Sequence, residues 1–213
     1  MAGLFIGVAI AHKICAQSYQ QNSCLQLPNR LSNEYVKHEF DEDCPMPILI
    51  YHFDTPTSTT NWQAINDGVM GGASVSRLRF DAAGHAVFEG EVSLENNGGF
   101  ASVRASQLNL GCADTVAYGL IAWGDGHTYK LNLRTDSGFD GVNYQAVFTP
   151  APGQWHQTIL PVTAFEPNFR GRWVSGAPAL QPEAVKQVGL MISDKQAGAF
   201  RLLIQNIEAL SRG

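Results

Sequence analysis

Two glycine-rich stretches constrain the fold of this chain more than any other feature. Residues 66–74 read NDGVMGGAS, and residues 96–104 read NNGGFASVR. Both stretches place adjacent glycines beside small and amide side chains. Glycine tolerates positive φ and carries no side-chain bulk, so in a β context such pairs indicate a bulge, a corner or a close approach of another group. The two stretches therefore predict two specially shaped backbone segments within one β-domain.

Strand signals repeat at short spacing from residue 48 onward. The predicted strands are residues 48–53, 74–80, 85–94, 100–104, 117–123, 128–134, 143–149, 155–161, 187–192 and 200–207. In residues 128–134, Tyr129, Leu131 and Leu133 alternate with polar residues, as expected of a strand with one buried face. Residues 182–186 are a short helix candidate that begins with proline. Short strands separated by glycine and proline turns predict an all-β sandwich or jelly roll.

The first 46 residues differ in composition from the rest of the chain. They are rich in Gln, Asn and Ser and end in an acidic run followed by Pro45 and Pro47. We expect an irregular or partly helical N-terminal extension over residues 1–46 and a single β-domain over residues 47–213. The apolar run 2–11 is about half the length that spans a bilayer. It is compatible with a flexible or amphipathic lead-in, a weak signal peptide or a membrane-contacting segment. We expect a cytoplasmic or membrane-peripheral location, with export as the alternative and no integral membrane span.

Charge and cysteine usage exclude several classes of function. The formal net charge of the 213 residues is −5 and no basic run is present, which argues against nucleic-acid binding. Cys15, Cys24, Cys44 and Cys112 form no zinc-ligand pattern. Cys112 is interpreted as a small buried apolar residue, and a disulfide among the three N-terminal cysteines stays open. No phosphate-binding loop or dinucleotide fingerprint occurs, so no metal or cofactor is predicted.

The sequence shows no recognisable catalytic constellation. No nucleophile elbow or paired histidine motif is present. Asp67, Glu89, Glu91 and Glu95 could supply paired carboxylates only if the fold brought two of them together. Glu89 and Glu91 share one strand face and are expected to form an exposed stripe. The chain is therefore predicted not to be an enzyme.

Polar side chains on neighbouring strands form the first candidate binding surface. They are Arg104, Lys130, Arg134, Tyr144 and Gln145. If they share the concave face of a sandwich, they make a polar groove with aromatic walls that suits a sugar or a peptide. The alternative is the hydrated outer face of a sheet.

The second candidate is the segment 165–172, which carries aromatics and arginines without strand alternation. Such loops often contain interface hot spots. Phe169, Arg170 and Arg172 are the candidate contact residues. The alternative is that Phe165 and Phe169 close one end of the sandwich while the arginines bind backbone carbonyls.

The chain resembles the complex I intermediate-associated protein 30 family. The resemblance is carried by Trp62, the two glycine-rich stretches, and residues 129–134, 144–148, 155, 160–161, 169–172, 189–196 and 198–200. It covers residues 53–207. It implies a galactose-binding-like jelly-roll β-sandwich and a non-enzymatic, chaperone-like role in assembling a bioenergetic membrane complex. The chain departs from the mitochondrial members because it has no Arg-rich leader. The resemblance therefore supports the fold more strongly than it supports a complex I partner.

The resemblance and the residue patterns together define three hypotheses. The first is an assembly factor that binds protein subunits or intermediates of NADH dehydrogenase (complex I) or of a photosynthetic complex. The second is a carbohydrate-binding module with a glycan as partner, and the third is a hydrolase acting through Asp67 and a second acid. The candidate partner- or ligand-binding residues are Asp67, Arg104, Arg134, Tyr144, Gln145, Phe169, Arg170 and Arg172.

Overall fold

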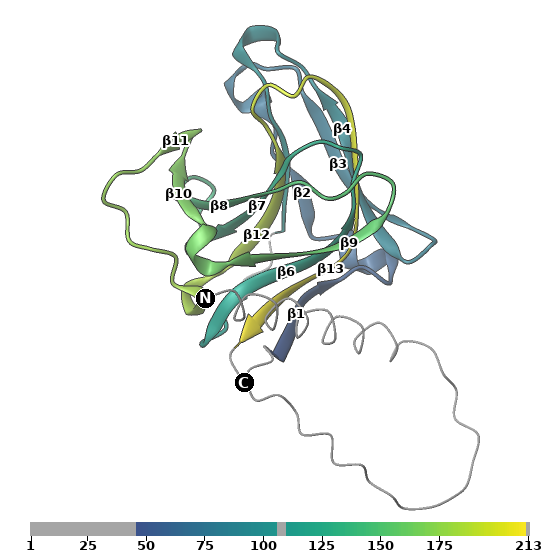
Figure 1. The fold of residues 1–213 in the computed structure, drawn as a ribbon. Coiled ribbons are helices and arrows are strands. Elements are labelled where there is room, and N and C mark those ends of the chain that lie inside the picture. Colours follow the sequence, from purple (N-terminus) through teal and green to yellow (C-terminus); the bar gives the residue numbers. More distant parts are fainter. Residues whose placement is uncertain (1–45, 106–109, 212–213) are drawn as a thin grey trace, which may run out of the picture. The chain divides into compact units, whose positions relative to one another are not determined.

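The structure is a computed structural model that describes residues 46–105 and 110–211, and its strands form two facing antiparallel sheets (Figure 1). The strands are β1 (Met46–His52), β2 (Trp62–Ala64), β3 (Val75–Asp81), β4 (His85–Val92), β5 (Ala101–Ala105), β6 (Thr115–Trp123), β7 (Tyr129–Arg134), β8 (Asn143–Phe148), β9 (Trp155–Pro161), β10 (Glu166–Phe169), β11 (Arg172–Trp173), β12 (Gln187–Ile192) and β13 (Gly198–Ser211). Short 3-10 turns lie at η1 (Pro56–Thr59), η2 (Asp67–Met70), η3 (Glu95–Asn97), η4 (Val162–Ala164) and η5 (Pro182–Ala184). Among the described residues no helix is long and apolar enough to cross a membrane.

The six-stranded sheet is organised around β13, its longest strand. The strand order is β3-β4-β13-β6-β9, and β1 also pairs with β13. The first half of β13 pairs with β4, and its second half pairs with β1 and β6. The predicted hairpin of β3 and β4 is present, with Gly84 at φ 83° in its turn. Because β13 bridges these strands, it ties the two ends of the described chain into one layer.

The seven-stranded sheet has the order β11-β10-β8-β7-β12-β5-β2. Its central strands are in register, so that Asn132 on β7 lies opposite Gln145 on β8 and Gly189 on β12. Gly189 in turn lies opposite Arg104 on β5. This register sets one transverse row of residues across the outer face of the sheet, and the candidate site below is built on that row.

The hydrophobic core fills the space between the two sheets. Its largest fully buried side chains include Tyr118 and Leu120 from one sheet and Tyr129, Leu131 and Leu133 from the other. The alternation predicted for β7 is therefore confirmed. Cys112 is partly buried and packs against the core.

The predicted all-β sandwich is confirmed over the described residues, with two local corrections. Of the helix candidate at residues 182–186, only residues 182–184 form a short 3-10 turn before β12. Residues 166–173 form the hairpin of β10 and β11 rather than an irregular loop, because Arg170 and Gly171 both adopt positive φ, at 49° and 76°, in a two-residue turn. The predicted N-terminal extension and the cysteines at positions 15, 24 and 44 lie outside the described residues.

Candidate functional site

The first glycine-rich stretch is organised around the carboxylate of Asp67. Asp67 has no exposed surface. One carboxylate oxygen accepts a hydrogen bond from the Ser74 backbone N–H at 2.9 Å. The other accepts from the Ser74 hydroxyl at 2.5 Å, from the Gly99 N–H at 2.7 Å and from the Phe100 N–H at 3.3 Å. The carboxylate therefore joins the two glycine-rich stretches, which are distant in sequence.

The glycines beside Asp67 are required for two different reasons. Gly71 and Gly99 have φ of 90° and 131°, where other residues are strained. Gly72 and Gly98 lie against the carboxylate instead. A Cβ at Gly98 would come within 2.6 Å of Asp67, and one at Gly72 would overlap it. Both the positive φ and the close approach expected from the sequence are present.

Asn66 extends this arrangement between the two sheets. Its side-chain oxygen accepts a hydrogen bond from the Ser76 hydroxyl on β3 at 2.6 Å and from the Ser102 N–H on β5 at 3.0 Å. The Ser74 hydroxyl, which donates to Asp67, also accepts a hydrogen bond from the Ser93 N–H at 2.9 Å. Because β3 belongs to the six-stranded sheet and β5 to the seven-stranded sheet, these bonds join the two layers along one edge.

Burial raises the pKa of the Asp67 carboxyl, but the hydrogen bonds from Ser74, Gly99 and Phe100 outweigh it and the pKa is lowered overall. Asp67 is thus an ionised, inaccessible structural group. It has no surface to offer a partner or a substrate, which removes the basis for a hydrolase acting through Asp67. Among the described residues no group of three or more His, Cys, Asp or Glu is placed to hold a metal ion.

The outer face of the seven-stranded sheet brings together Arg104 and Arg134. The Nη1 groups of both residues donate to the Phe139 carbonyl, at 3.0 Å and 2.9 Å. The Arg104 guanidinium also lies 5.6 Å from the centre of the Phe139 ring. Gly189 separates Arg104 from Asn132 in the transverse row and presents no side chain between them. We call the outer-face residues Arg104, Asn132, Arg134 and Asn143, with Phe139 above them, the two-arginine site.

Two guanidinium groups at one neutral carbonyl make an electrostatically unfavourable arrangement. Burial, reinforced by the positive charge of Arg134, lowers the pKa of Arg104 to about 10. The Arg134 side chain is 4% exposed, and its Nη2 pairs with the Asp136 carboxylate at 2.9 Å. Two positive charges therefore share this site. The Asp136 carboxylate binds Arg134 directly, and the charges of Asp136 and Asp140 offset part of the lowering of the Arg104 pKa.

Three buried polar atoms of this site have no hydrogen-bond partner within the described part of the chain. They are Asn132 Oδ1, Arg134 Nε and Asn143 Oδ1. Asn132 is 7% exposed as a residue. Buried polar groups are nearly always paired, so three unpaired atoms on neighbouring strands are an exception that a bound partner's polar groups would explain.

Tyr144 does not belong to this face, although the sequence analysis placed it beside Arg104 and Arg134. It is 3% exposed and lies in the core, where its hydroxyl donates to the Pro178 carbonyl at 3.2 Å. Tyr144, Ala146 and Phe148 form the buried side of β8. Gln145 does lie on the outer face with Asn132, as expected.

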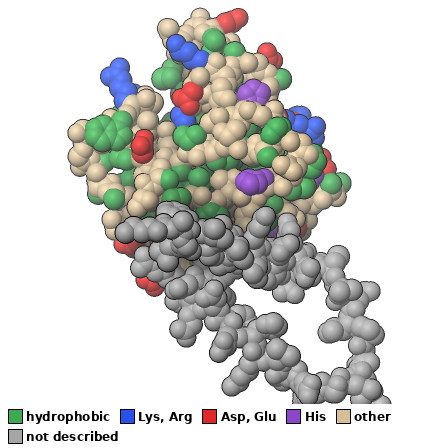
Figure 2. Space-filling model, in the orientation of Figure 1, with side chains coloured by type: hydrophobic (Ala, Val, Ile, Leu, Met, Phe, Trp, Pro, Cys, Tyr) green, Lys and Arg blue, Asp and Glu red, His purple; other side chains and the backbone are tan. Residues whose placement is uncertain are grey.

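The hairpin of β10 and β11 extends the sheet beside the two-arginine site. Phe169 is 39% exposed and the Arg170 guanidinium lies 5.3 Å from its ring centre. Arg170 also pairs with Asp140, next to Phe139. Trp173 is 63% exposed and Arg172 is exposed. Figure 2 shows hydrophobic and basic side chains together on this projecting part of the surface.

Phe165, at the start of the same segment, is buried against Tyr118 with ring centres 5.4 Å apart. It closes the core, as the second interpretation expected, but that interpretation is wrong for Phe169, which is 39% exposed, and for Arg170, which pairs with a carboxylate. Phe139 and Trp173 were missed by the sequence analysis, because an aromatic residue in a glycine-flanked loop or a two-residue strand carries no periodic signal.

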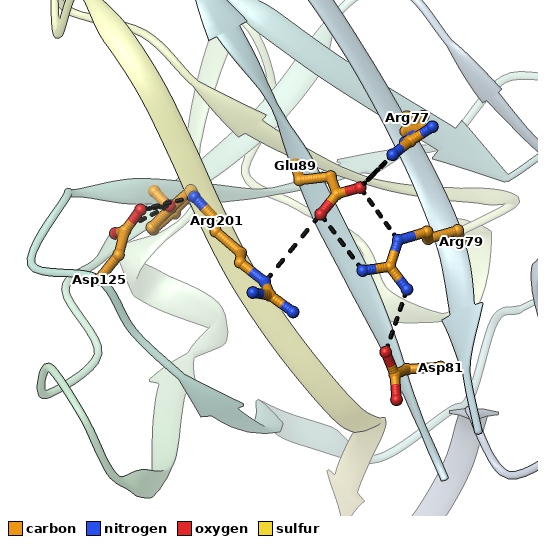
Figure 3. Close-up of polar contacts among 7 residues, drawn as sticks. Arg77, Arg79, Asp81, Glu89, Asp125 and Arg201 are labelled. Atoms are coloured by element: carbon orange, nitrogen blue, oxygen red, sulfur yellow. Dashed lines mark hydrogen bonds and ion pairs between the residues drawn. The ribbon is translucent and has the colours of Figure 1, made fainter. Parts of the chain in front are cut away.

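A second cluster of charges lies on the outer face of the six-stranded sheet (Figure 3). Glu89 accepts hydrogen bonds from Arg77 at 2.6 Å and from Arg79 at 3.0 Å, and Arg201 lies 4.0 Å away. Arg79 also reaches Asp81 at 3.1 Å. The Glu89 side chain is only 19% exposed, so the expected exposed acidic stripe is wrong at this position.

This cluster borders a shallow cavity of about 770 Å³ between β3, β4, β13 and residues 125–127. Hydrogen bonding to Arg79 is the main cause that lowers the pKa of Glu89. Because the charges in this cluster are largely paired with one another, it is a self-contained ion-pair network.

The fold and these residues define a galactose-binding-like β-sandwich with a polar, aromatic-rimmed outer face. The chain matches the family Complex I intermediate-associated protein 30 (CIA30) over residues 51–204, and it belongs to that family. It is 23% identical to the mitochondrial complex I intermediate-associated protein 30 of Neurospora crassa, over 85% of this chain and 80% of that protein. It is 24% identical to the protein of the same name in Drosophila melanogaster, over 84% of this chain and 70% of that protein.

Among solved structures, the chain is similar in fold to a family 11 carbohydrate-binding module of a Clostridium thermocellum cellulase. The TM-score is 0.59 at 11% identity, with 78% of this chain and 95% of the module covered. A structure of a family 11 module from the same organism in complex with a mixed-linked tetrasaccharide gives a TM-score of 0.57 at 14% identity, again over 78% of this chain and 95% of that one. At these identities the likeness concerns the fold alone.

Proposed function

We propose that this chain is a non-enzymatic binding domain that holds protein subunits or intermediates during assembly of a bioenergetic membrane complex, with complex I (NADH dehydrogenase) as the first candidate and a photosynthetic complex as the second. Membership of the complex I intermediate-associated protein 30 family is the observation that carries this proposal. The role would be to cover surfaces of a subunit until its permanent neighbours arrive.

The outer face of the seven-stranded sheet is the surface best suited to this role. It combines exposed Phe139 and Trp173 with Arg104 stacked on the Phe139 ring. The β10–β11 hairpin adds exposed Phe169, with Arg170 stacked on its ring, on the side opposite to Trp173. Aromatic residues and arginine are enriched at protein interfaces and at their energetic hot spots. The polar floor beneath them would provide specificity through hydrogen bonds rather than through bulk apolar burial.

The test is affinity purification of the tagged full chain from its native cells, solubilised in mild detergent and separated by native electrophoresis. We expect the chain to migrate with partly assembled complexes whose subunits are identified by mass spectrometry. The variant Trp173→Ala should reduce this association, whereas Val75→Ala, a similarly exposed position on β3, should not. Recovery of the chain only as free protein would contradict the proposal.

A carbohydrate-binding function is the second candidate. It is favoured by the unpaired Asn132 and Asn143 oxygens beside arginine donors, since sugar hydroxyls both donate and accept hydrogen bonds. Calorimetric titration with a β-1,3-1,4-linked tetrasaccharide tests it. Saturable binding that is lost in Arg104→Gln would support a glycan ligand, and no heat at millimolar concentration would exclude this sugar.

A further inference from the structure

We propose that the two-arginine site binds a carboxylate from an acidic, extended segment of a partner protein, which replaces the Phe139 carbonyl between Arg104 and Arg134. This inference rests on the proposed protein-binding function and names the chemistry that the partner presents. Three features of the site support it: its charge, its unpaired atoms and its position on the sheet.

The charge of the site favours an anionic group. Arg104 and Arg134 both donate to one backbone carbonyl, a neutral acceptor, at 3.0 Å and 2.9 Å. A carboxylate at the same position would accept the same two hydrogen bonds and neutralise charge, and charge-assisted bonds of this kind are roughly twice as strong as neutral ones. Of the two arginines, Asp136 binds only Arg134, and Asp140 is held by Arg170, so neither carboxylate bridges the two guanidinium groups.

The unpaired atoms indicate what flanks the carboxylate. Arg134 Nε is a buried donor, and Asn132 Oδ1 and Asn143 Oδ1 are buried acceptors, all without partners among the described residues. A carboxylate offers acceptors only, whereas a peptide also carries backbone N–H donors. An acidic peptide therefore offers partners for both kinds of atom, which displacement of the Phe139 carbonyl would have to expose, whereas a free dicarboxylate offers acceptors only.

The setting of the site favours an extended segment of chain rather than a small ligand. The transverse row from Gln145 through Asn132 and Gly189 to Arg104 crosses four strands, and Gly189 leaves its centre free of a side chain. Phe139 is 66% exposed beside Arg104, at one end of the row, and Trp173 on β11 is 63% exposed. A hydrophobic residue next to the acidic one in the partner would pack on these rings. The preferred sequence is thus Asp or Glu beside an aromatic or aliphatic residue.

The same geometry implies that residues 137–140 compete with the partner for Arg104 and Arg134. The Phe139 carbonyl occupies the position proposed for the partner's carboxylate, and the Asp140–Arg170 ion pair helps to hold it there. A partner must displace this carbonyl, so affinity is reduced by the cost of moving it. Asp140→Asn, which weakens the tie, should raise affinity about two- to fivefold, as expected for removal of an exposed ion pair.

The test begins with selection of a random 12-residue phage-displayed peptide library on the immobilised full chain, and in parallel on Arg104→Gln. We expect Asp and Glu to be enriched next to hydrophobic residues on the wild-type chain and not on the variant. Arg77→Gln, the same change on an exposed arginine of the other sheet, is the matched control and should select the wild-type motif. Melting temperatures of both variants are measured to confirm that they fold.

Calorimetry with one selected peptide and its Glu→Gln version completes the test. The acidic peptide should bind at least tenfold more tightly to the wild-type chain than its Gln version does, and this preference should vanish in Arg104→Gln. In nitrogen-15 spectra, the Arg134 Nε–H resonance should shift on binding, a readout that a purely structural arginine would not give.

Selection of basic or uncharged peptides, equal binding of the Glu and Gln peptides, selection of no peptide, or a ligand that is a glycan would each overturn the inference. Its failure is distinguishable from failure of the proposed function. If the wild-type chain and Arg104→Gln capture assembly intermediates equally, the function stands and the two-arginine site is not the contact. If acidic peptides bind as described but no intermediate is captured, the site stands and the assembly role does not.

Discussion

Replacing Asp67 with asparagine tests whether the glycine-rich signature is a structural clamp. The carboxylate accepts four hydrogen bonds, from the Ser74 N–H and hydroxyl and from the Gly99 and Phe100 N–H groups. Asparagine retains one acceptor oxygen. The asparagine side chain keeps more hydrogen bonds when this oxygen faces Gly99, Phe100 and the Ser74 hydroxyl. Its NH₂ group then faces the Ser74 N–H. One buried backbone donor then faces another donor.

The magnitude follows from these contacts. A buried donor left unsatisfied costs about 1–3 kcal/mol, and each remaining bond loses its charged acceptor, which reduces it by roughly 1 kcal/mol. Because asparagine is neutral, the variant avoids the cost of burying a charged carboxylate, and this offsets part of the loss. We therefore expect Asp67→Asn to lower the free energy of unfolding by about 2–4 kcal/mol. For a domain of this size, 1 kcal/mol corresponds to roughly 2–4 °C in melting temperature, so the shift should be about 4–16 °C.

Urea unfolding at pH 7, followed by tryptophan fluorescence and by circular dichroism, measures this change. The matched control is Asp54→Asn, the same substitution at an exposed position that contacts only His52 among the ion pairs of the described chain. It should change stability by less than about 0.5 kcal/mol. A loss in Asp67→Asn as small as in the control would refute the clamp.

The pH dependence provides an independent check on Asp67. Its pKa in the folded chain lies below the value of about 3.9 for an unfolded aspartate. The stability from its ionised form is therefore fully present above pH 4 and is lost as the pH falls through the folded pKa. The difference in the free energy of unfolding between the wild-type chain and Asp67→Asn should therefore shrink as the pH falls from about 4 toward 2. A constant difference over that range would show that ionisation of Asp67 is not the source of the stability.

Three further predictions follow from single contacts. Gly71→Ala should cost about 1–2 kcal/mol because φ is 90°, whereas Gly68→Ala, with open space and no positive φ, should cost less than half as much in the same urea assay. Tyr144→Phe should lower the free energy of unfolding by about 1 kcal/mol, because the hydrogen bond to the Pro178 carbonyl is lost, but it should leave partner capture unchanged. Reduced capture in a stably folded variant would show that Tyr144 takes part in binding. Glu89→Gln should flatten the stability profile between about pH 5 and pH 3, since the pKa of Glu89 is lowered in the folded chain, and an unaltered profile would mean that its ion pairs contribute little.

The sequence predicts the sandwich well because alternation and glycine placement are local signals. The buried side of β7 follows from Tyr129, Leu131 and Leu133, and the glycine pairs indicate tight backbone features before any contact is known. The side chain that requires those glycines, Asp67, is harder to identify from the sequence. Nothing local indicates that Asp67 reaches Gly99, because that contact depends on how β2, β3 and β5 meet.

The candidate site was harder to predict for reasons visible in particular residues. Both faces of β8 carry apolar side chains, Tyr144 on one and Val147 on the other, so alternation alone does not identify the buried face. Arg170 adopts a positive φ in the turn, which is unusual for arginine. The sequence therefore carries no signal for the β10–β11 hairpin. The approach of Arg104 to Arg134 over Gly189 is a cross-strand property that only the register reveals.

Site-specific photo-crosslinking in native cells tests whether the outer face of the seven-stranded sheet holds a protein partner. A photoreactive phenylalanine analogue is placed at Phe139, which is 66% exposed on that face, or at Val75, which is 60% exposed on β3 of the other sheet. We expect crosslinks from position 139 to subunits or assembly intermediates of a bioenergetic complex, and few or none from position 75. Crosslinks from position 75 alone, or from neither position in a folded protein, would contradict this expectation.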